Sequence, residues 1–189
     1  MMVGNLFTQF ASDPSQVSRT VNFLNALLSA GCILFLFWSI TRLVRSLLKE
    51  EKENLSVTDV IIILGSGLVG ALAYTFSDTF WFSAVEGEVY AFSSFLTALV
   101  FWMILRWQDE SDTVYGDRWI ILIAYIIGLS IGVHLLNLLC IPAIVLVFYY
   151  QKYRTISLKG AIAAIALSGL LIVLILFVYI PGMADIGGW

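Results

Sequence analysis

The feature that most constrains this chain is an apolar run of 32 residues, Trp119 to Tyr150, that contains no Asp, Glu, Lys or Arg. At about 1.5 Å per residue, one upright helix of this length would overrun the roughly 30 Å of hydrocarbon in a bilayer. Two full spans would need about 40 residues. Length alone therefore leaves the choice between one long helix and a hairpin of two short helices open.

The rest of the chain is similarly apolar. Hydrophobic residues make up 60% of the 189 residues and charged residues 12%, whereas soluble domains carry about 25% charged residues. A net charge of −3 excludes a nucleic-acid binder, which needs a dense basic patch, and two cysteines inside apolar runs exclude a disulfide scaffold. The composition predicts an all-α integral membrane protein formed by a single transmembrane domain over residues 1–189.

Six membrane segments are predicted, two of them short. Asp13 to Gln16 is typical of a helix start, with Pro14 in the first turn, and Pro181 is expected to end the last helix. Gly128 and Gly132 are spaced to let another helix approach closely. The predicted spans cover residues 20–41, 57–76, 84–106, 119–134, 137–151 and 160–180.

The basic residues decide the path of the long run. If Arg42 to Lys52 lies in the cytoplasm, Arg106, Arg118 and Lys152 to Lys159 must lie there too. The chain then crosses an even number of times between Arg118 and Lys152, so a hairpin bends near His134 to Asn137. Nine of the ten basic residues face the cytoplasm in this arrangement, with Arg19 outside. Both ends of the chain are then expected to be external.

A group of polar residues falls at the predicted external face. Ionisable groups at membrane depth are costly and are usually retained for substrates, ions or proton transfer. Glu86 has a structural explanation, since Ser83 and Glu86 have the spacing of a capping box. The group consists of Asp78, Glu86, Glu88, His134, Asn137 and Asp185.

Glu88 and His134 are the strongest functional candidates. Glu88 is predicted about 200° around the helix from Glu86, in aromatic surroundings where a partly desolvated carboxyl could accept a proton or bind a polar substrate. It could equally be a carboxylate that reaches the membrane surface. His134 and Asn137 share a face if the helix persists, although His134 could merely bond a backbone group or Ser130. One histidine without ligand-spaced partners predicts no metal site.

Two blocks of this sequence resemble a bacterial family of membrane proteins, the domain-of-unknown-function 2723 family, which is grouped with protein O-mannosyltransferases. The first block runs from Trp81 to Ala91, and the second runs from Gly128 to Asn137 and is followed by Pro142. The resemblance covers nearly the whole chain, and it implies that the protein lies in the inner membrane of a bacterium. It implies a GT-C glycosyltransferase fold and transfer of a sugar, with mannose expected, from a polyprenyl-phosphate carrier to a protein acceptor on the external side.

The resemblance also implies site residues. Inversion at a sugar carbon needs a base for the acceptor hydroxyl, and Glu88 is the catalytic candidate. No cofactor is expected, and the expected partners are membrane lipid, the lipid-linked donor and the acceptor. The expected substrate-binding residues are Trp81, Glu86, Tyr90, His134 and Asn137.

The chain departs from the family pattern at both ends. The catalytic Asp that such enzymes carry in their first external loop is expected upstream of Met1, and the sequence stops soon after its last span. We therefore expect a fragment of a larger enzyme. The alternative is a non-enzymatic membrane module, either a degenerate scaffold or a small transporter subunit.

Overall fold

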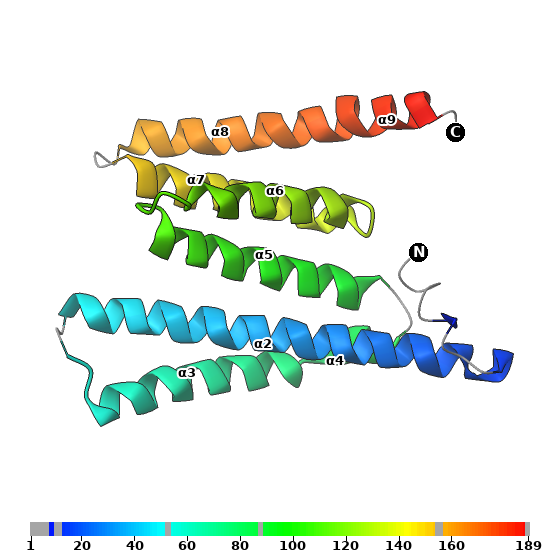
Figure 1. The fold of residues 1–189 in the computed structure, drawn as a ribbon, viewed down its shortest axis with the longest axis horizontal. Coiled ribbons are helices and arrows are strands. Elements are labelled where there is room, and N and C mark those ends of the chain that lie inside the picture. The colour runs from blue at the N-terminus through cyan, green and yellow to red at the C-terminus, as the bar shows by residue number, and fades with distance from the viewer. Residues whose placement is uncertain (1–7, 10–12, 52–53, 87–88, 154–156, 188–189) are drawn as a thin grey trace.

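A computed structural model describes residues 8–9, 13–51, 54–86, 89–153 and 157–187. The long helices of this part lie side by side in a flattened row, in the order α3, α2, α5, the α6–α7 pair and α8 (Figure 1). The bounds of the elements are η1 Pro14–Gln16, α2 Val17–Glu51, α3 Val57–Thr75, α4 Asp78–Val85, α5 Tyr90–Glu110, α6 Asp117–Ile131, η2 Leu135–Leu139, α7 Cys140–Lys152, α8 Leu158–Leu174, the π-helical turn η3 Ile175–Tyr179 and α9 Ile180–Gly187.

Four of the described helices are long and apolar enough to cross a membrane: Val17–Leu48, Val57–Thr75, Tyr90–Glu110 and Leu158–Met183. The apolar run at 119–150 folds as a hairpin, with α6 and α7 running in opposite directions (Figure 1). These helices have 15 and 13 residues, so they are shorter than the roughly 20 residues of a full span. That all six segments cross the membrane stays a prediction.

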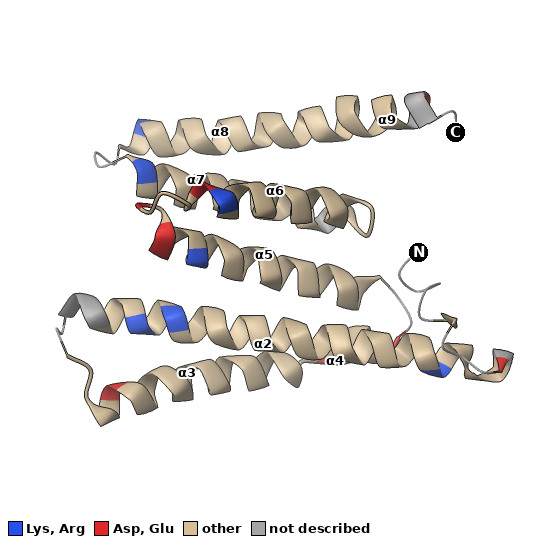
Figure 2. Cartoon of the chain, viewed as in Figure 1, with Lys and Arg blue, Asp and Glu red and all other residues tan. Residues whose placement is uncertain are grey.

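Most of the Lys and Arg positions gather at one end of the row (Figure 2). This is the end at which α2, α5 and α7 finish and α6 and α8 begin, as the charge pattern requires. Arg19, near the start of α2, lies at the opposite end. Lys52 and Arg154, which were also predicted at the basic end, lie outside the described residues.

Polar contacts fasten the helices to one another at the basic end. Arg42 of α2 donates two hydrogen bonds to Asp109 of α5, of 2.8 and 2.6 Å. Glu110 accepts from Arg106 and from Trp119 Nε1 of α6, each at 2.8 Å. Charge-assisted and two-pronged bonds of this kind fix orientation as well as adding energy. They hold the start of the hairpin against α5.

The core lies between α5 and the hairpin. Val100, Met103, Ile104 and Trp107 of α5 are buried with Ile123 of α6. Trp107 also stacks on Phe148 of α7, with ring centroids 5.4 Å apart and ring planes 16° apart. Helix α5 is therefore the element around which the other helices are arranged.

The predicted third span, residues 84–106, is wrong at its start. Residues 78–85 form the separate helix α4, and α5 begins only at Tyr90. The predicted capping box is also absent, because Ser83 lies inside α4, where its hydroxyl donates to the carbonyl of Thr79 at 2.9 Å. Glu86 instead follows the last turn of α4, where its amide donates to Phe82. Glu86 therefore does not lie in the first turn of α5, as the predicted span required.

Two predictions about Pro and Gly are wrong as well. The last helix continues through Pro181 into α9, since the preceding turn widens and Ile180 donates to Ile175, five residues back. Proline has no backbone N–H to donate, and the changed hydrogen-bond pattern of a π-helical turn allows the helix to continue past it. Among the described residues, no other helix comes within 4 Å of a Cβ placed at Gly128 or Gly132. The close approach occurs instead at Gly67 and Gly70 of α3, against α2.

Candidate functional site: the α5–hairpin junction and its neighbouring cavity

The candidate site lies where the first turns of α5 meet the bend of the hairpin, at the end of the row opposite the basic cluster. Tyr90, Ser93 and Thr97 are spaced three and four residues apart on α5, so they lie along one face of the helix. The rings of Tyr90 and His134 are in contact, with centroids 5.5 Å apart. The hairpin thus brings His134 to α5, 44 residues away in sequence from Tyr90.

Asn137 lies next to this pair and is buried. Its side-chain oxygen accepts hydrogen bonds from Thr97 and, at 3.4 Å, from Ser93. Its exposed fraction is 2%. Asn137 was predicted to contact substrate, whereas here its side-chain oxygen contacts the two hydroxyls of α5.

The link between α4 and α5 is anchored to α2. The side-chain amide of Asn25 donates to the backbone oxygen of Glu86, and Asn25 is itself buried. Glu86 is an exposed residue, and so is Trp81 on α4. Glu88, the catalytic candidate, lies outside the described residues, so its role stays a prediction.

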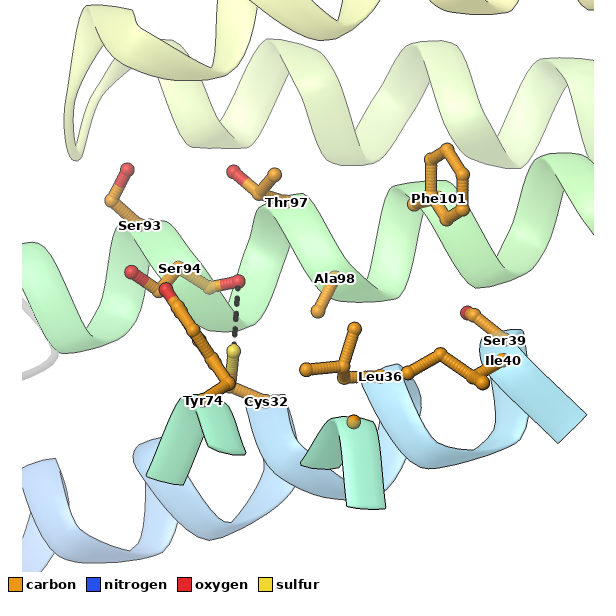
Figure 3. Close-up of a pocket in the computed structure, with 11 residues that line it drawn as sticks. Cys32, Leu36, Ser39, Ile40, Tyr74, Ser93, Ser94, Thr97, Ala98 and Phe101 are labelled. Atoms are coloured by element: carbon orange, nitrogen blue, oxygen red, sulfur yellow. Dashed lines mark hydrogen bonds between the residues drawn. The ribbon is translucent and has the colours of Figure 1, made fainter. Parts of the chain in front are cut away.

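A cavity of about 420 Å³ lies beside this junction, between α2, α3 and α5. Cys32 and Leu36 of α2 face Ser94 and Ala98 of α5 across it (Figure 3). The surface of the cavity is mostly apolar, although five of its eleven lining residues carry hydroxyls. The lining residues are Cys32, Leu36, Ser39, Ile40, Gly70, Tyr74, Ser93, Ser94, Thr97, Ala98 and Phe101. The volume falls in the range of small-ligand pockets, about 300–1,000 Å³.

The cavity and the junction share two residues. Ser93 and Thr97 line the cavity and also bond Asn137. Ser93 is one turn from Tyr90, so about 4.5 Å of helix separates the cavity from the Tyr90–His134 pair. An apolar cavity therefore leads to a small group of neutral hydrogen-bonding side chains.

These hydroxyls and the cavity were missed by the sequence analysis. Two features of the sequence could have indicated them. Tyr90, Ser93 and Thr97 are spaced to share one helical face, and positions 93–97 of an otherwise apolar span contain three hydroxyl residues. Among the described residues, no group of three or more His, Cys, Asp or Glu side chains could hold a metal ion.

A polytopic helical membrane protein with a polar junction beside an intramembrane cavity is the class that this fold and site define. Residues 1–157 match the family described as the protein O-mannosyl-transferase TMEM260 N-terminal domain, and the chain belongs to that family. It is thus a membrane protein with a glycosyltransferase-like, O-mannosyltransferase-type domain. No curated protein and no solved structure matches the chain.

Proposed function

We propose that this chain forms part of the membrane region of a glycosyltransferase that takes a sugar, expected to be mannose, from a polyprenyl-phosphate carrier and transfers it to a protein acceptor. The family supports the type of reaction. The observation that supports the lipid-linked donor is the cavity of about 420 Å³ beside the Tyr90–His134 pair. An amphiphilic donor needs both an apolar cavity for its chain and a polar place for its headgroup.

The placement of the cavity fits such a donor. Cys32, Leu36 and Ala98 lie within membrane-length helices, so a hydrocarbon chain can enter without leaving the apolar layer. The phosphate and sugar would then lie near Tyr90 and His134, whose hydroxyl and imidazole can donate hydrogen bonds. Among the described residues, Arg19 is the one Lys or Arg at the end of the row where the site lies. The described part of the site therefore offers the phosphate mainly hydrogen-bond donors other than Lys and Arg.

The transfer requires a base and a stabilised leaving group. The acceptor hydroxyl oxygen would attack the anomeric carbon, the bond from that carbon to the phosphate oxygen would break, and the phosphate would leave with the bonding electron pair. Glu88 is the proposed base that takes the hydroxyl proton. His134 is proposed to donate a hydrogen bond to the phosphate as its charge develops.

We also propose that this site faces the outside of the cell, with the expected membrane being the bacterial inner membrane. Apart from Arg19, the described basic residues gather at the opposite end of the row. Lys and Arg are enriched in cytoplasmic segments. The N-terminal end of α2 and the C-terminal end of α9 then face outward with the site.

Cys32 provides a direct test, because it lines the cavity and the other cysteine, Cys140, does not. The Cys140→Ser protein in lipid nanodiscs is treated with a small membrane-permeant maleimide, with and without polyprenyl phosphate. We expect labelling of Cys32 to slow about tenfold when the ligand is about ten times its dissociation constant, since only the unoccupied cavity reacts.

Two controls make this test specific. Ile165→Cys, in protein that also lacks both native cysteines, places a thiol on an exposed position of α8 and should label at an unchanged rate. A phospholipid added at the same concentration should not protect Cys32. Unchanged labelling with polyprenyl phosphate, or equal protection by the phospholipid, would contradict the proposal and favour a non-enzymatic scaffold.

A further inference from the structure

The bend of the hairpin is fastened to α5 by one buried side chain. Asn137 lies on η2, and its oxygen accepts from the hydroxyls of Ser93 and Thr97. We call these three residues the amide–hydroxyl clamp. Asn137 is 2% exposed, so the clamp excludes solvent.

The clamp is poorly explained as a device for stability. The side-chain nitrogen of Asn137 is buried and has no hydrogen-bond partner within the described part of the chain. A buried donor without a partner is unfavourable, whereas an apolar side chain of similar shape at the same place would avoid that penalty. The amide therefore points to a role in fixing geometry.

The clamp determines where His134 lies. On one side of His134, its backbone amide donates to the carbonyl of Ser130 at the end of α6, over 2.9 Å. On the other side, Asn137 follows three residues later and is tied to α5. The ring between these two attachments packs on Tyr90, at the start of the same helix that carries Ser93 and Thr97.

We infer that Asn137 is a positioning residue, which holds the hairpin bend on α5 so that His134 stays beside Tyr90 and the cavity. This inference rests on the proposed function, because the position of His134 matters only if it meets the donor. Ser93 and Thr97 link the two sites, since they bond Asn137 and line the cavity.

His134 is the only histidine of the sequence, and it can report its own surroundings. Protein carrying a histidine-free purification tag and isotope-labelled histidine gives one imidazole NMR signal in nanodiscs. We expect Asn137→Leu and the nearly isosteric Thr97→Val to shift or broaden this signal by more than its linewidth. The midpoint of thermal unfolding of Asn137→Leu should stay the same or rise, because this variant removes the buried amide nitrogen that has no partner among the described residues. A purely structural role would not allow that result.

Two further variants serve as controls. Asn137→Asp keeps an acceptor for both hydroxyls and should restore a signal close to that of the unmodified protein. Ser168→Ala removes a buried hydroxyl on α8, which bonds only its own helix at the carbonyl of Ile165, and should leave the signal unchanged.

The outcomes separate this inference from the proposed function. An unchanged imidazole signal in both Asn137→Leu and Thr97→Val would overturn the positioning role. A fall in the unfolding midpoint of Asn137→Leu that parallels the change in its signal would overturn it too. Polyprenyl phosphate should shift the signal of the unmodified protein. A missing response to that lipid, with the variants still shifted, would contradict the proposed function alone.

Discussion

Helices α5 and α8 are both apolar enough to cross a membrane, but the protein uses them differently. In the most apolar 18-residue window of each span, 44% of residues are buried for α5 and 11% for the span that contains α8. Helix α5 packs against α2, α6 and α7, whereas α8 packs against α7. The family match also ends at residue 157, before α8 begins.

The polar residues of the two helices differ in the same way. Ser93 and Thr97 of α5 bond Asn137 of the hairpin, and Ser94 accepts from Cys32 of α2 through its backbone oxygen. Ser168 of α8 is buried, yet it bonds only within its own helix. These polar groups of α5 therefore bond other elements of the protein, whereas the hydroxyl of Ser168 bonds its own helix.

The largest expected effect of this difference is on stability. Trp107→Ala should lower the free energy of unfolding by about 3–5 kcal/mol, because Trp107 is 2% exposed and stacks on Phe148. Leu167→Ala, on the exposed face of α8, should change it by less than about 0.5 kcal/mol. Unfolding in mixed micelles, followed by circular dichroism, measures both. Similar losses in the two variants would remove the distinction between the helices.

A smaller effect is expected where two helices touch through a glycine. A side chain at Gly67 of α3 would clash with Thr41 and lie 2.9 Å from the ring of Phe37, so Gly67→Leu should destabilise the protein by about 1–3 kcal/mol. Gly169→Leu on α8 meets open space and should leave stability unchanged or raise it by up to about 1 kcal/mol. The same unfolding assay measures the stability of both variants. Destabilisation by Gly169→Leu would show that α8 is covered by another helix.

The sequence predicted those parts of the fold that depend on charge and length. Lys152 could return to the side of Arg118 only if the run between them turned back, and the structure contains that hairpin. The break before Tyr90 was missed because residues 84–106 read as one apolar segment. Pro181 was expected to end its helix, and the π-helical turn that accommodates it depends on backbone geometry, which leaves no signal in composition.

The site could be predicted only in part. His134 and Tyr90 were each expected to contact substrate, and the structure brings their rings together. Their neighbours Ser93 and Thr97 were missed, because periodicity identifies a helical face without telling which element covers it. The contact of Asn137 with α5 depends on how the bend of the hairpin packs, which the sequence does not show. The catalytic role of Glu88 stays a prediction.

The central claim is that the hairpin returns the chain to the basic end and leaves its bend with His134 at the other end. Single cysteines, in protein without the native cysteines, test this at three positions that are exposed: Val114, Tyr153 and Leu135. Intact cells are treated with a membrane-impermeant maleimide before and after their membranes are opened. We predict that the thiols at 114 and 153 react only after opening, whereas the thiol at 135 reacts on intact cells. Reaction of 114 and 153 from opposite sides would contradict the hairpin and the site built on it.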